Sequence, residues 1–339
     1  MKAKRSAILM TAVSVVAAVL FFADLTVGSA GLSLREVWQG LVLDKADEVT
    51  RYIVLNFRIP KAVTALLVGA ALSASGLQMQ TLFRNPLAGP YVLGVSSGAS
   101  LGVALFVLGM PLLGMSASGA WWSNIGAVGA AWIGAAVILL VIIAVTARVR
   151  DIMVVLIMGM MFGSAATAVV EILQYMSPEG AVKSYVVWTM GSLGGVMLSE
   201  LWILVPVLIA GLAVSVALIK PLNMMLLGEN YARTMGLNIK STRMWIFIST
   251  ILLAGTATAY CGPISFIGLA VPHIVRMVFR NADHRILMPA SIICGGGIML
   301  LCDMATQLPP SDLTLPINTV TSLIGIPVVI AVIFRSRKY

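Results

Sequence analysis

The sequence predicts an all-α polytopic membrane protein, a bundle of about ten transmembrane helices. Composition is the first observation, because 60% of the 339 residues are hydrophobic, only 10% are charged and the mean hydropathy is +1.01. Soluble domains carry about 25% charged residues. The second observation is a series of apolar runs that approach the roughly 20 residues needed to cross a bilayer. The third is the sorting of basic residues into alternate loops. We therefore expect a single transmembrane domain over residues 1–339.

Ten segments are candidates for crossing the membrane. They lie at 6–28, 59–82, 91–109, 124–147, 152–175, 201–219, 244–261, 262–280, 286–304 and 316–334. The first follows a basic end, as a secretory signal would, but its apolar run is as long as a spanning helix and we expect it to be retained. The segment at 262–280 is interrupted by Pro263 and Pro272 and is still mostly apolar. Because the number is even, both termini are predicted to lie on the same side.

The charges orient this topology. With the N-terminus inside, the inner segments hold 16 of the 22 basic residues and 3 of the 13 acidic residues. Lys and Arg are enriched on the cytoplasmic side of membrane proteins, so both termini are predicted to be cytoplasmic. The same asymmetry accounts for the net charge of +9, and we expect no nucleic-acid partner.

Residues 32–57 precede the second span on the outer side. Leu34, Val37, Trp38 and Leu41 would share one helical face there. An amphipathic helix of this kind lies in the membrane interface, so the pattern predicts a short interfacial helix.

Small residues recur every four positions in the spans, a spacing that lets helices approach closely in lipid. The positions are Gly94, Gly98 and Gly102, then Gly126, Ala130 and Gly134, and finally Gly159 and Gly163. They predict a tightly packed helical bundle and indicate no chemistry.

Proline and glycine interrupt the apolar pattern at RNPLAGPYVLG (84–94) and at CGPISFIGLAVPH (261–273). Irregular backbone at membrane depth must be buried in protein or line a wet cavity. Each break contains Gly-Pro, an apolar stretch and a further Gly. Paired breaks in two halves of a transporter indicate an internal repeat with the pathway between the halves. Two interpretations stay open: such a repeat, or ordinary proline kinks.

Residues that could carry catalysis or ion coupling are sparse. His273 and His284 show no zinc-binding spacing with a Glu, and no Ser or Cys nucleophile comes with an evident base. His273 and Arg276 share a helix face, which favours a structural or docking role. Glu171 is the one candidate for the buried acid of a proton-coupled carrier. Its place near the outer end of a span counts against ion coupling, and we expect neither an enzyme nor a bound metal.

The stretch LLGENYARTMGLNIKSTR (226–243) is a polar, helix-sized insert between two spans. Its GLNIKST portion is faintly similar to a phosphate-binding loop, which needs Gly, four residues, and then Gly-Lys-Ser/Thr. Ile239 stands where the second Gly must be, so the loop could not wrap phosphates. We expect no cofactor on this chain; if ATP drives it, another subunit binds ATP and Mg²⁺.

Four stretches of the chain carry a family pattern: RIPKAVTALLVGAALSASGLQMQTLFRNPLAGPYVLGVSSGASLG (58–102), KPLNMMLLGENYARTMGL (220–237), GPISFIGLAVPHIVRMVFRNADHRILMPAS (262–291) and LPINTVTSLIGIPVVIAVI (315–333). They resemble the FecCD/BtuC-like permease family of binding-protein-dependent ABC importers for iron-siderophores, haem and vitamin B12. The resemblance covers about a third of the chain, in the family's order. It implies a type II ABC importer permease bundle in the bacterial inner membrane. It also implies a homodimer with one path between the subunits, two cytoplasmic ATP-binding subunits and an extracytoplasmic substrate-binding protein.

The resemblance makes 220–243 a coupling loop, two short helices that sit in a cleft of the ATPase. Gly228 and Gly236 bracket one helical stretch, and Glu229 and Arg233, at i and i+4, can pair. A rigid knob of this kind can pass ATPase closure to the attached spans as rigid-body motion. A solvated loop is the alternative. The residues expected to couple to the ATPase are Leu227, Gly228, Glu229, Ala232, Arg233, Met235, Gly236 and Leu237.

The resemblance also implies a docking surface on the outer side. Arg58 and Lys61 match basic positions that face acidic residues of the binding protein in relatives, and such pairing is a physical reason for basic residues on an otherwise negative surface. Snorkelling at a helix start is the alternative. A third basic position in some relatives is Gln307 here, which weakens the docking argument or moves one contact elsewhere.

The cytoplasmic gate is expected in two places. In the 84–90 turn, Asn85 and Leu87 match residues that narrow the exit in relatives. The other gate position, at the start of the fifth span, falls on Ile152 and Met153. Small polar residues stand there in some relatives, so this chain departs from the pattern at that point.

The expected function is an importer permease, driven by a partner ATPase, for an iron chelate (siderophore or haem) or for cobalamin, with the iron chelate favoured. Two rival classes are open from the residues alone. An ion-gradient-driven secondary transporter would work without an ATPase and would need Glu171. An intramembrane enzyme or a structural subunit would associate with no ATPase.

Overall fold

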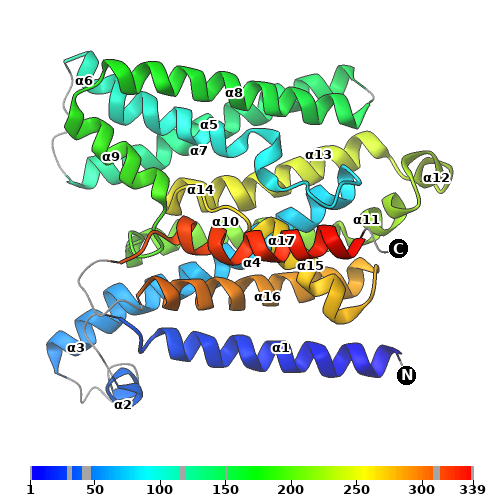
Figure 1. The fold of residues 1–339 in the computed structure, drawn as a ribbon, viewed down its shortest axis with the longest axis horizontal. Coiled ribbons are helices and arrows are strands. Elements are labelled where there is room, and N and C mark those ends of the chain that lie inside the picture. Colours follow the sequence, from blue (N-terminus) through cyan, green and yellow to red (C-terminus); the bar gives the residue numbers. More distant parts are fainter. Residues whose placement is uncertain are drawn as a thin grey trace.

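The computed structural model describes residues 2–28, 33–39, 47–114, 120–149, 151–307 and 314–336. Within these ranges every regular element is helical, and the long helices run side by side across the view in Figure 1. The α-helices are α1 (Lys2–Asp24), α2 (Leu34–Trp38), α3 (Glu48–Ile53), α4 (Ile59–Leu82), α5 (Val95–Ala104), α6 (Met110–Leu112), α7 (Ala120–Arg148), α8 (Ile152–Met176), α9 (Glu179–Met190), α10 (Leu198–Ala217), α11 (Ile219–Leu226), α12 (Glu229–Thr234), α13 (Ile239–Thr250), α14 (Thr256–Cys261), α15 (Ile267–Phe279), α16 (His284–Thr306) and α17 (Ile317–Ser336). Short π or 3-10 turns occupy η2 (Val54–Arg58), η3 (Pro90–Leu93), η4 (Leu105–Gly109) and η5 (Ile251–Gly255).

Eight helical stretches in the described residues are long and apolar enough to cross a membrane. Two shorter apolar helices, Ile267–Phe279 and Ile317–Ala331, bring the number to the ten that the sequence predicts. The first of these, α15, has 13 residues, so it is about 20 Å long and shorter than a hydrocarbon core of about 30 Å. The five residues directly before it, 262–266, are not helical.

The outer segment before α4 differs from the prediction of one interfacial helix over 32–57. Two helices form, α2 and α3, and α3 continues through η2 into α4 as a single stretch from Glu48 to Leu82. Pro60 lacks a backbone N–H, and the π turn η2 directly before it carries the helix through this position. Leu41 of the predicted face lies outside the described residues.

A capping box starts α2. The Ser33 hydroxyl accepts from the Glu36 N–H at 3.3 Å, and the Glu36 carboxylate accepts from the Ser33 N–H at 2.7 Å. These reciprocal bonds satisfy donors that a helix start leaves open. The Ser33 hydroxyl and then its backbone N–H hold the pKa of Glu36 below its ordinary value.

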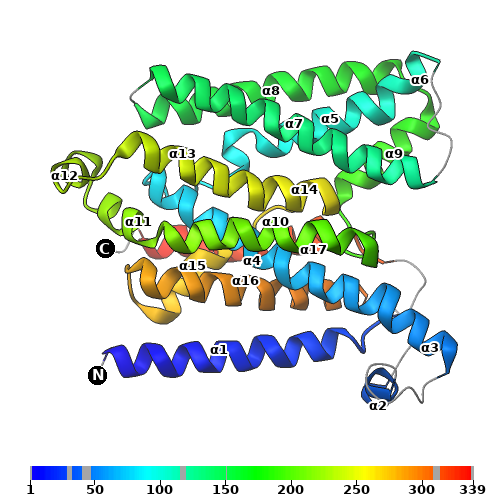
Figure 2. The same cartoon turned by 180° about the vertical axis from the view of Figure 1, so that it is seen from behind.

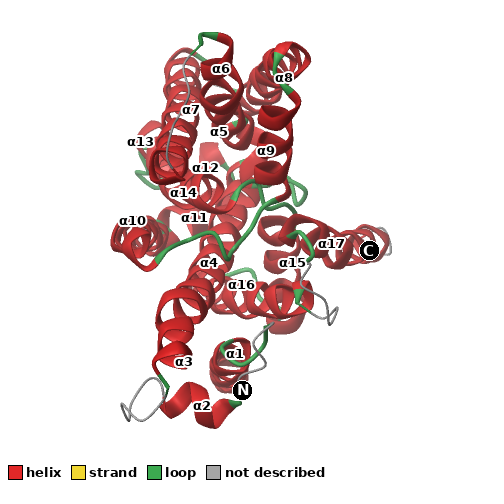
Figure 3. Cartoon of the chain, turned by 90° about the vertical axis from the view of Figure 1, so that its left-hand side faces the viewer, coloured by secondary structure: helices red, strands yellow, loops and turns green. Residues whose placement is uncertain are grey.

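Helix α4 lies at the centre of the bundle. In the 18-residue apolar window of the span that contains α4, 83% of the residues are buried, against 6% in the window of the α1 span. The end-on view in Figure 3 shows α4 in the middle of the other helices, with α1 at the edge. Its sequence, IPKAVTALLVGAALSASGLQMQTL, is rich in Ala, Gly and Ser. Small side chains allow neighbouring helices to approach on every face.

The small residues lie at the helix contacts, as their spacing predicts. Helices α5 and α7 cross where a Cβ on Gly134 would be 2.0 Å from the carbonyl oxygen of Gly98. One turn further on, a Cβ on Gly102 would be 2.0 Å from the carbonyl oxygen of Ala130. The glycines of α8 face the chain around the start of α5 in the same way. This confirms the predicted close packing.

The two ends of the chain lie at the same end of the bundle. Figures 1 and 2 place the N-terminal end of α1, the C-terminal end of α17 and helix α12 together there. This arrangement agrees with an even number of crossings. Which membrane side this end faces stays a prediction from the charges.

Candidate coupling and gating site

The segment 220–243 folds as two short helices, α11 and α12, and the start of α13. Gly228 and Gly236 stand between the helices with φ of 114° and 86°, in a region that residues with a side chain rarely adopt. The Asn238 side-chain oxygen then accepts from the Ser241 N–H at 3.1 Å and caps α13. Glycine at the turns and an Asn cap are local signals, which is why the sequence could place this segment.

An ion pair fixes the segment. The Glu229 carboxylate accepts from Arg243 Nη2 at 2.6 Å through each oxygen, and from Nε at 3.1 Å. The expected pair of Glu229 with Arg233, one turn on, is replaced by this contact, and Arg233 is exposed. The Arg243 side chain is only 5% exposed. A forked, largely desolvated pair is stronger than a pair on a helix surface.

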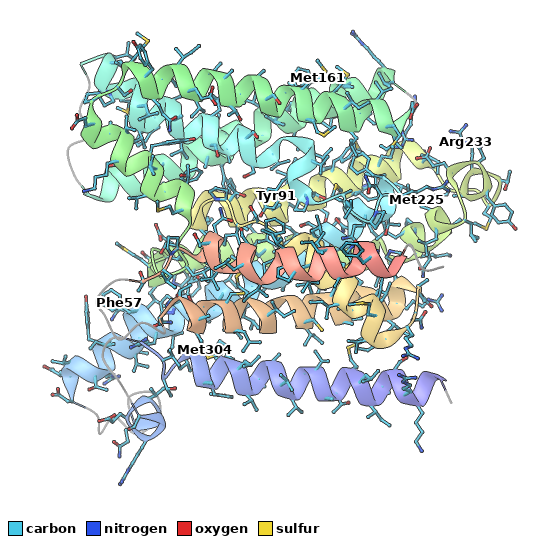
Figure 4. The ribbon with its side chains drawn as sticks, in the orientation of Figure 1. Phe57, Tyr91, Met161, Met225, Arg233 and Met304 are labelled. Carbon is cyan, nitrogen blue, oxygen red and sulfur yellow. The ribbon has the colours of Figure 1, made fainter. Side chains whose placement is uncertain are left out.

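The segment presents apolar side chains outward. Leu227 is 64% exposed, Tyr231 57% and Met235 43%. In Figure 4, Arg233 lies at the tip of the segment and Met225 lies on its inner side. Among the predicted coupling residues, Gly228 and Ala232 are buried, Glu229 and Leu237 are partly buried, and Leu227, Arg233, Met235 and Gly236 are exposed. The structure therefore brings them together in one projecting knob with an apolar rim.

The first predicted gate lies in the turn that follows α4. The Asn85 side-chain oxygen accepts from the Leu87 N–H at 2.9 Å and closes this turn. Leu87 is 42% exposed. Arg84, with φ of 48°, points back to the coupling segment, where its Nη2 would be 2.7 Å from a Cβ on Gly228. The gate turn and the coupling segment are thus in contact.

The second predicted gate lies at the start of α8. Asp151 caps this helix by accepting from the Met153 N–H at 2.9 Å. Met153 is 49% exposed, and Ile152 is partly buried. A gating role for these residues, as for Asn85 and Leu87, stays a prediction.

The two Pro-Gly breaks pack against each other. His273 Nε2 is 2.7 Å from the carbonyl oxygen of Pro86, so Nε2 carries the proton. A Cβ on Gly268 would be 3.0 Å from Pro90 Cδ. Tyr91, next to Pro90, lies near the middle of the bundle in Figure 4. His273 therefore holds one break to the other.

The predicted docking residues have partners within the chain. Arg58 is 8% exposed; it donates through Nη1 to the carbonyl oxygen of Val27 and lies 3.4 Å from Gln307 Oε1. Lys61 Nζ is 2.9 Å from Asp303 Oδ2, on a side chain that is 2% exposed. Gln307 Nε2 is 3.2 Å from the same carboxylate oxygen. These bonds tie α4 to α16 and to the end of α1. Docking stays a prediction, and it would use cations that already have partners.

Lys61→Met should destabilise the protein even without a binding protein. Removing the cation leaves Arg58 as the remaining counter-charge near the buried Asp303 carboxylate. Breaking a buried pair costs about 3 kcal/mol, and the 18% exposure of Lys61 together with the charge of Arg58 reduces this to about 2 kcal/mol. Thermal unfolding in detergent measures the effect. Lys183→Met, at an exposed lysine of α9, is the matched control, expected within about 0.5 kcal/mol of wild type. Unchanged stability with weakened binding-protein affinity would favour docking alone.

Residues 16–335 match the model of the FecCD transport family. The chain belongs to this family. It is 31% identical to the hemin transport system permease protein HmuU of Yersinia pestis over 321 residues, which is 94% of this chain and 93% of the relative. The vitamin B12 import system permease protein BtuC of Salmonella paratyphi A is 36% identical over 288 residues, 84% of each chain. The predicted family resemblance is confirmed.

A solved structure supports the same assignment. A metal-chelate type ABC transporter in an inward-facing conformation is similar to this chain with a TM-score of 0.84 and 26% sequence identity. The similarity covers 96% of this chain and 99% of the other. The predicted all-α permease bundle is therefore confirmed, and this FecCD member is a multi-pass membrane permease.

The FecCD chain contains a polar cluster that the sequence did not identify as a group. Asn223 Nδ2 donates to Asp283 Oδ1 at 2.6 Å, and His284 and Thr81 complete the cluster. Asp283 also caps α16 by accepting from the Arg285 N–H at 2.8 Å. That bond, and then the Asn223 amide, hold the pKa of Asp283 below its ordinary value. In the sequence, an Asp directly before a helix start indicated a cap at Asp283. No sequence pattern indicated that Asn223 would join it.

Glu171, the candidate for ion coupling, is not enclosed among the helices of this FecCD chain. It lines an open cavity of about 440 Å³ with Tyr91, Ser97, Ser164 and Thr167. The Glu171 side chain is exposed in the single chain. Acidic side chains in membrane proteins face the bundle interior or a water-filled cavity, and Glu171 takes the second of these places.

Proposed function

We propose that this chain is the permease subunit of an ABC importer that moves a metal chelate into the cytoplasm. Two copies of the chain form the path, two cytoplasmic ATP-binding subunits supply the energy, and an extracytoplasmic binding protein delivers the cargo. ATP and Mg²⁺ bind to the partner ATPase, and the permease carries no cofactor. The protein lies in the bacterial inner membrane with both termini in the cytoplasm.

The observation that carries this proposal is the coupling knob. The Glu229–Arg243 ion pair locks α12 onto α13, and α13 continues through η5 into α14 as one span. The knob also presents the exposed side chains of Leu227, Tyr231 and Met235. An apolar patch on a rigid projection suits a protein partner, and a rigid connection to a span suits the transfer of movement.

An iron chelate, either a siderophore or haem, is the proposed cargo, with cobalamin as the alternative. The named relatives include a hemin permease and a vitamin B12 permease with comparable coverage. Their identities of 31% and 36% do not separate the two cargoes. The wall of the open cavity around Glu171 carries one carboxylate among hydroxyl groups and glycines, which gives little fixed charge to hold a cargo. Affinity is therefore assigned to the binding protein.

Reconstitution in proteoliposomes tests this function. The permease is assembled with its ATPase and binding protein, and uptake of hemin, a ferric siderophore and cyanocobalamin is measured separately. We expect ATP-dependent uptake of one chelate, with none when the ATPase or the binding protein is omitted. Growth rescue of a strain that lacks the gene, with each chelate in turn, provides an independent identification of the cargo.

An ion gradient provides the contrasting condition. Uptake driven by a proton or sodium gradient without ATPase, and abolished by Glu171→Gln, would contradict the proposal. ATP-dependent uptake that is unchanged in Glu171→Gln supports it. Failure of all three chelates with an active, assembled ATPase complex would reject the cargo class.

A further inference from the structure

A chain of hydrogen-bonded side chains runs from the coupling segment to the end of α4. Asn223, on α11, accepts the backbone N–H of His284 at 2.9 Å. The same Asn223 Oδ1 lies 2.9 Å from His284 Nδ1. On the other side of the ring, Nε2 lies 2.8 Å from Thr81 Oγ1. Three helices that are distant in sequence, α11, α16 and α4, are joined at one imidazole ring.

The donors and acceptors in this chain have a defined order. Asn223 Nδ2 donates to Asp283 Oδ1 at 2.6 Å, which directs the other carboxamide atom, Oδ1, toward the ring. A carboxamide oxygen only accepts, so His284 Nδ1 carries the proton. In the neutral ring Nε2 is then an acceptor for the Thr81 hydroxyl, whose single proton is shared with the carbonyl oxygen of Leu77 at 2.9 Å. Asn223 and the His284 ring are thus each held in one orientation.

Burial makes these bonds difficult to exchange for water. His284 is 1% exposed and Thr81 is 4% exposed. A buried polar group that loses its partner has no solvent to replace it. Asn223 is partly buried, so a displacement of α11 has to move the ring and α4 with it, or leave the buried ring without its Asn223 acceptor.

The chain of bonds ends beside the predicted gate. Thr81 is followed within α4 only by Leu82, and the turn with Asn85 and Leu87 comes next. Arg84 makes a second contact between this turn and the coupling segment at Gly228. On the opposite side, His273 of α15 holds the carbonyl oxygen of Pro86.

We propose that Asn223, His284 and Thr81 are positioning residues that transmit displacement of the coupling segment to the gate turn at residues 84–90. The role rests on the proposed function, because an ATPase supplies the displacement. A buried hydrogen-bonded network that joins two elements has a few discrete arrangements and so moves as a unit. The gate turn then follows the ATPase through α11, the His284 ring and the end of α4.

The test measures movement of the gate turn without any cargo. Leu87→Cys introduces a reporter at a position that is 42% exposed. Cys261 and Cys302 are buried and Cys294 is partly buried, and the parent without the reporter gives their background. The full complex with its ATPase is labelled with a maleimide, with and without Mg²⁺–ATP. We expect the labelling rate of Leu87→Cys to change with nucleotide, and we expect Asn223→Ala to reduce this change at least fivefold.

Two further variants separate transmission from a general loss of structure. Thr81→Val keeps the side-chain shape and removes only the hydroxyl, and it should reduce the nucleotide effect in the same way. The double variant, Asn223→Ala with Thr81→Val, should lose no more of the nucleotide effect than the more severe single variant, because both substitutions break the same link. Asn318→Ala is the matched control: Asn318 Oδ1 also accepts a backbone N–H from another element, that of Ser265, at 3.0 Å. It should retain the full nucleotide effect.

The outcomes distinguish this inference from the proposed function. If Leu87→Cys responds to nucleotide and the response persists in Asn223→Ala and Thr81→Val, the inference is overturned and the proposed function stands. If the loss of the nucleotide effect in the double variant equals the sum of the losses in Asn223→Ala and Thr81→Val, the two residues do not act through one link and the inference is overturned. If Leu87→Cys alone shows no response while the ATPase is bound and active, ATP-driven gating fails, and the inference fails with it.

Discussion

Gly76→Ala is expected to destabilise the protein by about 3 kcal/mol, at the upper end of the cost of overpacking a core. Gly76 lies where α4 crosses α15. An added Cβ would be 1.7 Å from the carbonyl oxygen of Gly268 and 2.4 Å from its carbonyl carbon. Both atoms belong to the backbone and cannot rotate away, so the two helices must separate. Thermal unfolding in detergent measures the loss.

Gly129→Ala provides the control for Gly76→Ala. Gly129 lies within α7 and is exposed, and an added Cβ there meets no atom within 4 Å. Alanine favours a helix over glycine by about 1 kcal/mol, so this variant should be as stable as wild type or more stable. Equal stability of the two variants would contradict the close approach of α4 and α15.

The separation of α4 from α15 should also impair transport. Gly268 packs against Pro90 and against the carbonyl oxygen of Leu72, so a shift at Gly76 displaces both Pro-Gly breaks. A backbone displacement of about 1 Å can cost a hundredfold in activity where geometry is critical. We expect the surviving folded Gly76→Ala protein to show a lower uptake rate per ATP hydrolysed than Gly129→Ala.

Arg243→Met is expected to weaken coupling to the ATPase by more than tenfold. The substitution keeps an unbranched chain in a site where the arginine side chain is 5% exposed, but it leaves the Glu229 carboxylate without this forked partner. Breaking a buried pair costs about 3 kcal/mol, and the 26% exposure of Glu229 lowers this to about 2 kcal/mol. The cost falls on the folded coupling knob. Affinity for the ATPase and uptake per ATP hydrolysed measure it.

Arg233→Met is the comparison for Arg243→Met. Arg233 is exposed on α12, so its loss should weaken contact with the ATPase without loosening the knob. Limited proteolysis of the 220–243 segment should therefore increase in Arg243→Met and not in Arg233→Met. The double variant Glu229→Gln with Arg243→Met also removes the unpaired carboxylate charge. It should therefore be more stable than Arg243→Met alone. An Arg243→Met complex with wild-type affinity and coupling would disprove the role of the ion pair.

The sequence predicted the features of this molecule that depend on nearby residues. Apolar run length decides where a helix can cross a bilayer, and ten crossings follow from it. Spacing of small residues decides which helix face can approach another, and the contacts at Gly102 and Gly134 lie where that spacing indicated. Gly228 and Gly236 marked the coupling segment because a positive φ is a local property.

Pairings between charged groups could not be predicted in this way. Glu229 has a suitable partner four residues away in Arg233, yet it binds Arg243, fourteen residues away. Docking by Arg58 and Lys61 stays a prediction, and the sequence did not indicate their contacts within the chain: Lys61 with Asp303 on α16, and Arg58 with Val27 after α1 and Gln307 after α16. In each case the choice depends on which helix ends the fold brings together, and on how far burial strengthens one pair over another.

The sequence by itself determined the membrane-spanning class, the approximate number of apolar helices that could cross a membrane, the small-residue contacts and the place of the 220–243 segment. Only the tertiary structure decided that the two Pro-Gly breaks touch at His273 and Pro86, and that Asn223 reaches Thr81 through His284. The physical reason is the distance along the chain over which each kind of interaction acts. Helix formation and membrane insertion respond to residues within a few turns. A buried hydrogen bond forms only where separate helices have packed and have excluded water.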